Sequence, residues 1–136
     1  MKQYTISLAL TILASACAVA FAQDIGPEDL SALVKGRKWQ IAMQGDLSHA
    51  GHATYWDFNA DGTVCARFGG AKPNDRCADN GEWRLEGQML CWDLKVIGEQ
   101  YGYKSACVRI RKSGTQEYEA HNAKAGYRQF VFRPVK

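Results

Sequence analysis

The residues of this chain best suited to chemistry are its histidines, its cysteines and one acidic segment. His49 and His52 form the only close histidine pair, and His121 lies far along the chain. On an extended segment, side chains three residues apart point to opposite faces, which does not suit chelation unless the chain turns at Gly51. The pattern therefore favours structural or surface histidines over a metal site.

The acidic segment 57–62 imitates the opening of an EF-hand calcium loop. The twelfth position of such a loop needs a bidentate glutamate, and this chain has Phe68 there. The flanking residues alternate as strands do, whereas an EF-hand needs helices on both sides. We expect a β-hairpin without bound calcium.

Four cysteines follow the first 22 residues: Cys65, Cys77, Cys91 and Cys107. They show no close Cys-x-x-Cys or Cys-x-x-His spacing of a zinc motif. An even number of cysteines in a small exported domain predicts two disulfides, and bonded cysteines cannot act as nucleophiles. The sequence also lacks a Gly-x-Ser-x-Gly, a His-Glu-x-x-His and a phosphate-loop motif. We expect no metal, no cofactor and no enzymatic activity.

The first 22 residues are typical of a cleaved signal peptide, with one early cation, an apolar stretch and a small-residue site at Ala22. This stretch is too short for a comfortable membrane span, and we expect no transmembrane segment. Lipid attachment through Cys17 is an alternative, but Ala14 stands where a lipobox usually has a larger aliphatic residue. We expect export to the periplasm or beyond.

Cleavage at that site leaves residues 23–136 as a single domain with one modest core. Residues 23–103 carry 8 basic and 12 acidic side chains, whereas residues 104–136 carry 8 basic and 2 acidic ones. The cationic C-terminal part could suit an anionic partner, although a solvated strand face explains it as well. No feature predicts nucleic-acid binding.

Three glycine-containing turns join runs in which apolar and polar residues alternate, which is typical of β-hairpins. A short helix should begin near Pro27 and end at Gly36. We expect eight strands after it, at roughly residues 37–44, 52–59, 63–68, 80–85, 88–95, 104–111, 115–121 and 127–133.

Consecutive antiparallel strands with short hairpins predict an all-β fold, an eight-stranded antiparallel up-and-down barrel with the helix over one mouth. A sandwich of two four-stranded sheets is the alternative. Apolar side chains must pair with apolar side chains across each turn, and this condition sets the register. The predicted pairs are Phe58 with Val64, Trp83 with Leu90, Ile110 with Gln116 and Val108 with Tyr118, around turns at residues 60–62, 86–87 and 112–114.

The disulfide pairing follows from the same register. If Leu90 faces Val108, then Cys91 faces Cys107 on the outer side, close enough for a bond after modest adjustment. Three connectivities are possible for four cysteines. We predict Cys65–Cys77 together with Cys91–Cys107.

Several segments carry a family resemblance in their order and spacing: residues 30–39, 55–64, 81–84, 89–92 and 107–108. They resemble a group of small exported proteobacterial proteins of unknown function. They are also similar to lipocalin-like (calycin-type) barrels, which share the tryptophan of the first strand and the Asp-Gly-Thr hairpin. The first resemblance implies no catalytic residues, and the second implies a small apolar ligand inside the barrel.

His52, Trp56 and Arg128 share the parity of the apolar face and are the candidate ligand contacts. Thr54 and Gln116 have the same parity, and strand ends could instead leave such residues at the rim. The leading hypothesis is a non-enzymatic exported barrel that binds a small apolar ligand. The alternative is a protein-interaction module, such as an inhibitor of a periplasmic enzyme or an immunity protein, acting through the loops 45–51, 69–80 and 96–103.

Overall fold

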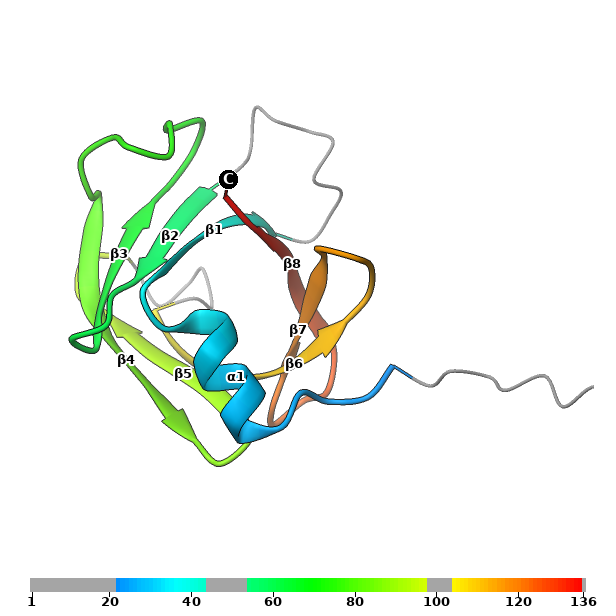
Figure 1. The fold of residues 1–136 in the computed structure, drawn as a ribbon. Coiled ribbons are helices and arrows are strands. Elements are labelled where there is room, and N and C mark those ends of the chain that lie inside the picture. The colour runs from blue at the N-terminus through cyan, green and yellow to red at the C-terminus, as the bar shows by residue number, and fades with distance from the viewer. Residues whose placement is uncertain (1–21, 44–53, 98–103, 136) are drawn as a thin grey trace, which may run out of the picture.

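The computed structural model describes residues 22–43, 54–97 and 104–135. One helix precedes eight antiparallel strands that close into a barrel in sequential order (Figure 1), so the predicted fold class is confirmed. The elements are α1 (Pro27–Val34), β1 (Arg37–Met43), β2 (Thr54–Phe58), β3 (Thr63–Arg67), β4 (Asp79–Glu86), β5 (Met89–Leu94), β6 (Ser105–Lys112), β7 (Tyr118–Asn122) and β8 (Arg128–Pro134). Residues 1–21 of the predicted leader, His49 and His52 lie outside the described residues.

Helix α1 lies across one opening of the barrel (Figure 1). Pro27 occupies the first turn, where a missing N–H costs nothing, and acidic residues there suit the helix dipole. Leu30 and Val34 are fully buried in the core, which fixes the face that the helix presents to the strands. The segment before the helix is tied to β6, because the Arg111 guanidinium donates to the Asp24 carboxylate at 2.6 Å. The helix therefore closes this end of the barrel.

Strand direction alternates around the barrel, so successive connections lie at alternate ends. The turns that follow β2, β4 and β6 share the end covered by α1. The connections that follow β1, β3, β5 and β7 share the opposite end. Of the three loops predicted as interaction loops, 69–80 belongs to that opposite end, whereas 45–51 and most of 96–103 lie outside the described residues.

The register predicted around residues 60–62 is confirmed, since Phe58 faces Val64. Gly62 has a φ of 87°, which glycine adopts without a steric penalty and which allows the tight return of the chain. Cys91 faces Cys107, as predicted. Both predicted disulfides are confirmed, with Cα–Cα distances of 5.4 Å for Cys65–Cys77 and 4.1 Å for Cys91–Cys107.

Two other register predictions are wrong by an even number of residues. The turn between β4 and β5 has two residues, as expected, but Trp83 faces Trp92 instead of Leu90. Between β6 and β7, Ile110 faces Ala120 instead of Gln116, and Val108 faces Asn122 instead of Tyr118. Residues 113–117 form a longer loop, closed by Ser113 N–H donating to Glu117 O at 3.0 Å, so the seventh strand begins at Tyr118 rather than residue 115. An even shift keeps every side chain on its face, so apolar parity cannot detect it.

The interior of the barrel is filled by aromatic rings from walls that are not neighbours in the sheet. Trp56 of β2 and Trp92 of β5 lie 5.4 Å apart between ring centroids, at an edge-to-face angle. Trp92 also approaches Phe130 of β8, at 5.7 Å. These three residues are at most 2% exposed. Side chains from separate sides of the barrel thus meet in its middle.

Candidate functional site

Trp56 points into the barrel, as its parity predicted, and it is fully buried. Its cross-strand neighbour Trp39 is fully buried too. The indole N–H groups of both residues are buried without a hydrogen-bond partner. A buried tryptophan N–H usually finds an acceptor, so two neighbouring unpaired donors mark a place where an acceptor atom could bind.

Arg128 does not point inward, and the orientation predicted for it is corrected. Its side chain is exposed, and its guanidinium donates to the Glu119 carboxylate at 3.1 Å on the outer wall. The register between β7 and β8 shifts by one residue between Ala120 and His121, as it does at a β-bulge. A bulge adds one residue to one strand and reverses the alternation beyond it, so the parity of Phe130 no longer applies at Arg128.

The other inward candidates divide between the core and the surface. Thr54 is buried, and its hydroxyl donates to the carbonyl oxygen of Ile41 at 3.3 Å. Gln116 lies exposed in the β6–β7 loop and does not point inward, because this segment is not part of a strand. Trp56 is thus the one predicted ligand contact that the structure places in the barrel interior, among the residues it describes.

Glu119, His121 and Arg128 form a small network on the outer wall of β7 and β8. His121 Nε2 lies 3.0 Å from the Glu119 carboxylate. Hydrogen bonding to His121 is the main cause that lowers the pKa of Glu119; burial opposes it and Arg128 adds to it. Arg109 of β6 faces His121 in the register. Arg109 and Arg128 thus place two cations on this face beside Glu119, and such cations can attract anions.

A groove of about 600 Å³ lies on the outer wall of the barrel. Three side chains from neighbouring strands form its floor: Tyr55 of β2 and Arg133 of β8 both face Gln40 of β1 in the register. The Arg133 guanidinium donates to the side-chain oxygen of Gln40 at 2.9 Å, which orients both groups. The walls are Pro73 on one side and residues 114–117 with the C-terminal Pro134 and Val135 on the other.

The Pro73 wall is held in place by the outer face of the sheet. Lys38 donates to the carbonyl oxygen of Pro73 and to the Asn74 side chain. Arg67, whose side chain is only 7% exposed, donates to the carbonyl oxygen of Asp75 and pairs with Asp57 at 3.1 Å. The Cys65–Cys77 disulfide closes the base of the same loop. The groove is therefore preformed.

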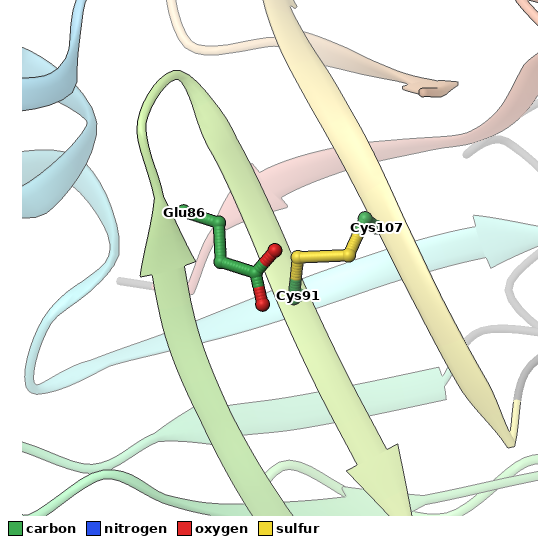
Figure 2. A group of neighbouring side chains, drawn as sticks. All are labelled: Glu86, Cys91 and Cys107. Carbon is green, nitrogen blue, oxygen red and sulfur yellow. A yellow bond between two sulfur atoms is a disulfide. The ribbon is translucent and has the colours of Figure 1, made fainter. Parts of the chain in front are cut away.

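One group of potential metal ligands lies on the opposite part of the wall. The ligand atoms of Glu86, Cys91 and Cys107 lie within 4.8 Å of one another, and the carboxylate points toward the sulfur atoms (Figure 2). The two sulfur atoms are bonded to each other and so are not thiolates. The Glu86 carboxylate accepts a hydrogen bond from Arg84 at 2.6 Å.

Sequence reasoning missed both the groove and this group. Their residues come from distant positions and form no motif, and only the strand register brings them together. Both could have been found only from the correct strand register, which for example places Arg84, Cys91 and Cys107 side by side on three neighbouring strands.

Searches against protein-family models, curated proteins and solved structures find no match for this chain. In the part of the chain that the structure describes, no helix is long and apolar enough to cross a membrane.

Proposed function

We propose that this protein is an exported, non-enzymatic binding module that recognises a segment of another protein in the groove of its outer wall. The observation that carries the proposal is the preformed groove, whose floor is a row of three in-register side chains. Its Pro73 wall is held by the Cys65–Cys77 disulfide and by hydrogen bonds from Lys38 and Arg67. A site that is already ordered loses less conformational entropy on binding.

The chemistry of the groove suits a polypeptide. Its volume lies within the roughly 300–1,000 Å³ range of ligand sites, but half of its lining residues are exposed to water and the others are only partly buried. Tyr55 and Pro73 offer apolar surface, and the amide of Gln40 can donate to or accept from a peptide backbone. Arg133 adds a cation that can select an acidic side chain.

The filled interior supports an outer-wall site over a roomy internal one. Two disulfides support an oxidising compartment, and together with the leader predicted from the sequence they favour the periplasm or the cell exterior. A module of this kind could serve as an inhibitor of a periplasmic enzyme or as an immunity protein, since both act through binding alone.

The test is affinity capture from the periplasmic fraction of the native host with three immobilised proteins: the wild type, Arg133→Ala and Arg84→Ala. Arg84 is a matched control, because it is an exposed arginine on a distant part of the outer wall. We expect a partner that the wild type and Arg84→Ala retain and that Arg133→Ala loses. A partner retained equally by all three, or none at all, would contradict the groove.

A second candidate function is the binding of a small apolar ligand inside the barrel, and the unpaired indole N–H groups of Trp39 and Trp56 favour it. Such a ligand would present a hydrogen-bond acceptor to these donors. Native mass spectrometry of protein from its own host would detect a bound molecule. If Trp56→Phe, which removes the donor and keeps an aromatic ring, retains the same adduct as the wild type, Trp56 is not the contact.

A further inference from the structure

We propose that reduction of the Cys91–Cys107 disulfide converts this part of the outer wall into a binding site for a thiophilic divalent cation such as Zn²⁺. The ligands would be the two cysteine thiolates and the Glu86 carboxylate (Figure 2). Zinc prefers thiolate, imidazole and carboxylate ligands and accepts a water molecule as the fourth one.

The three ligands come from three neighbouring strands of the closed sheet. Glu86 ends β4, Cys91 lies in β5 and Cys107 in β6. Their ligand atoms already lie within 4.8 Å of one another. Zinc binds thiolate sulfur at about 2.3 Å and carboxylate oxygen at about 2.0–2.2 Å, so side-chain rotations of the two cysteines would place all three atoms around one ion.

The backbone keeps the two cysteines opposite each other without the disulfide. Strands β5 and β6 pair continuously from Met89 with Arg109 to Asp93 with Ser105, and the cysteine pair lies in the middle of this ladder. Reduction removes one covalent link and leaves these backbone hydrogen bonds in place. The thiols would therefore remain neighbours, as a chelating pair must.

Two arginines of the outer wall lie beside the three ligands. Arg84 of β4 faces Cys91 of β5, and its guanidinium donates to the Glu86 carboxylate at 2.6 Å and to the Asp93 carboxylate at 2.7 Å. Arg109 lies two residues beyond Cys107 on the outer face of β6, and none of the described residues pairs with it. These arginines can pair with the negative charge of the ligands.

The redox step needs an external dithiol, such as a thiol–disulfide oxidoreductase. Cys107 is partly exposed and Cys91 is fully buried, so the attacking thiolate reaches the Cys107 sulfur. It forms a mixed disulfide there, and the Cys91 sulfur leaves as a thiolate. The second thiolate of the dithiol then releases Cys107. Two electrons and two protons pass to the protein, the dithiol becomes a disulfide, and cation binding returns the two thiol protons to solvent.

The test is a titration with Co²⁺, whose thiolate complexes absorb visibly, followed by competition with Zn²⁺. The purified exported chain is used with its disulfides intact or after reduction by a water-soluble phosphine, which is oxidised to the phosphine oxide. We expect one tetrahedral, thiolate-bound Co²⁺ in the reduced chain and none in the oxidised one. We also expect Glu86→Gln to weaken the affinity about tenfold or more.

Two double variants separate this site from other thiols. Cys65→Ser with Cys77→Ser should keep the Co²⁺ spectrum, because no third ligand accompanies that pair among the described residues. Cys91→Ser with Cys107→Ser should abolish it. The proposal is overturned if the reduced wild type gives no thiolate band, if that band survives loss of Cys91 and Cys107, or if the reduced chain unfolds and Zn²⁺ does not restore its circular dichroism.

Discussion

The interior of the barrel and its outer wall are built from the same strands, but their side chains make different kinds of contact. Inside, Trp56, Trp92 and Phe130 pack ring against ring at centroid distances of 5.4 and 5.7 Å. Outside, charged residues form ion pairs, and some of these stay half-exposed, as between Arg84 and Glu86, whose side chains are 51% and 46% exposed. The contacts inside are mainly apolar, whereas the contacts on the wall are mainly between charged groups.

This difference separates stability from recognition. Burial of apolar area contributes about 25 cal/mol per Å², and a buried aromatic ring contributes several times more than an exposed ion pair, which is worth about 0–1 kcal/mol. The interior can therefore hold the fold while the residues of the wall change. Binding sites that use the wall need not weaken the barrel.

The largest expected effect is that of Trp92→Ala, which should lower the free energy of unfolding by about 3–5 kcal/mol because it empties the middle of the barrel. Urea denaturation followed by circular dichroism measures this. Trp83→Ala is the control, because Trp83 is only partly buried and its replacement should lower the free energy of unfolding clearly less. Equal losses for the two variants would break the distinction between the interior and its rim.

Removal of the Cys65–Cys77 disulfide should cost about 3 kcal/mol in the chain-entropy model, and so should removal of Cys91–Cys107, because their sequence separations of 12 and 16 are similar. The two disulfide removals should increase hydrogen exchange in different parts of the molecule. Hydrogen exchange should rise in residues 68–78 when Cys65 and Cys77 are replaced by alanine, and it should stay low in β5 and β6 when the other pair is replaced. The opposite pattern would show that the groove wall does not depend on its disulfide.

Asp79 stands between the two regions, at the barrel end opposite α1. Burial raises the pKa of its carboxyl, but hydrogen bonds from the backbone N–H groups of Ile97, Lys95 and Val96 outweigh this and lower it. Its contribution to stability is thus present above the unfolded pKa of about 3.9 and is lost as the pH falls through the lower folded value.

Asp79→Asn should therefore lower the free energy of unfolding by about 2 kcal/mol at neutral pH, because charged hydrogen bonds are lost. The gap between wild type and variant should narrow below about pH 4. Urea denaturation at a series of pH values measures the gap. A gap that stays constant down to about pH 3 would mean that the ionised carboxylate does not hold the loop.

The smallest effect on stability should come from Arg133→Ala in the floor of the groove, at most about 0.5 kcal/mol. The same change should abolish capture of the partner. A loss of several kcal/mol would show that the outer wall supports the fold after all, and the separation between the two regions would fail.

Much of the interior could be predicted, because alternation of apolar residues and glycine placement decide which face of each strand is buried. The pair Phe58 with Val64 follows from this, whereas the pair Cys91 with Cys107 also required the assumption that Leu90 faces Val108. The alternation of apolar residues could not reveal an even shift of register, as at Trp83, because such a shift leaves every side chain on the same face of the sheet. The extra residue between Arg128 and Phe130 could not be predicted in this way either, since no residue type marks such an insertion in a strand.

The groove and the cysteine–carboxylate group could not be predicted. Gln40 and Arg133 are neighbours only because the last strand closes on the first one. Closure of the barrel is a property of the whole sheet, so the local pattern of apolar and polar residues in the sequence does not predict it. The same holds for Glu86 beside Cys107, which depends on two successive registers.

Closure has one more consequence. Each of the eight described strands has a hydrogen-bonded neighbour on both sides, so none of them offers a free backbone edge. A bound peptide cannot add a strand to the sheet by β-augmentation, so backbone hydrogen bonds between strands cannot contribute to its affinity. The barrel must therefore recognise the peptide through side-chain contacts alone. A peptide of the same composition in scrambled order should not bind.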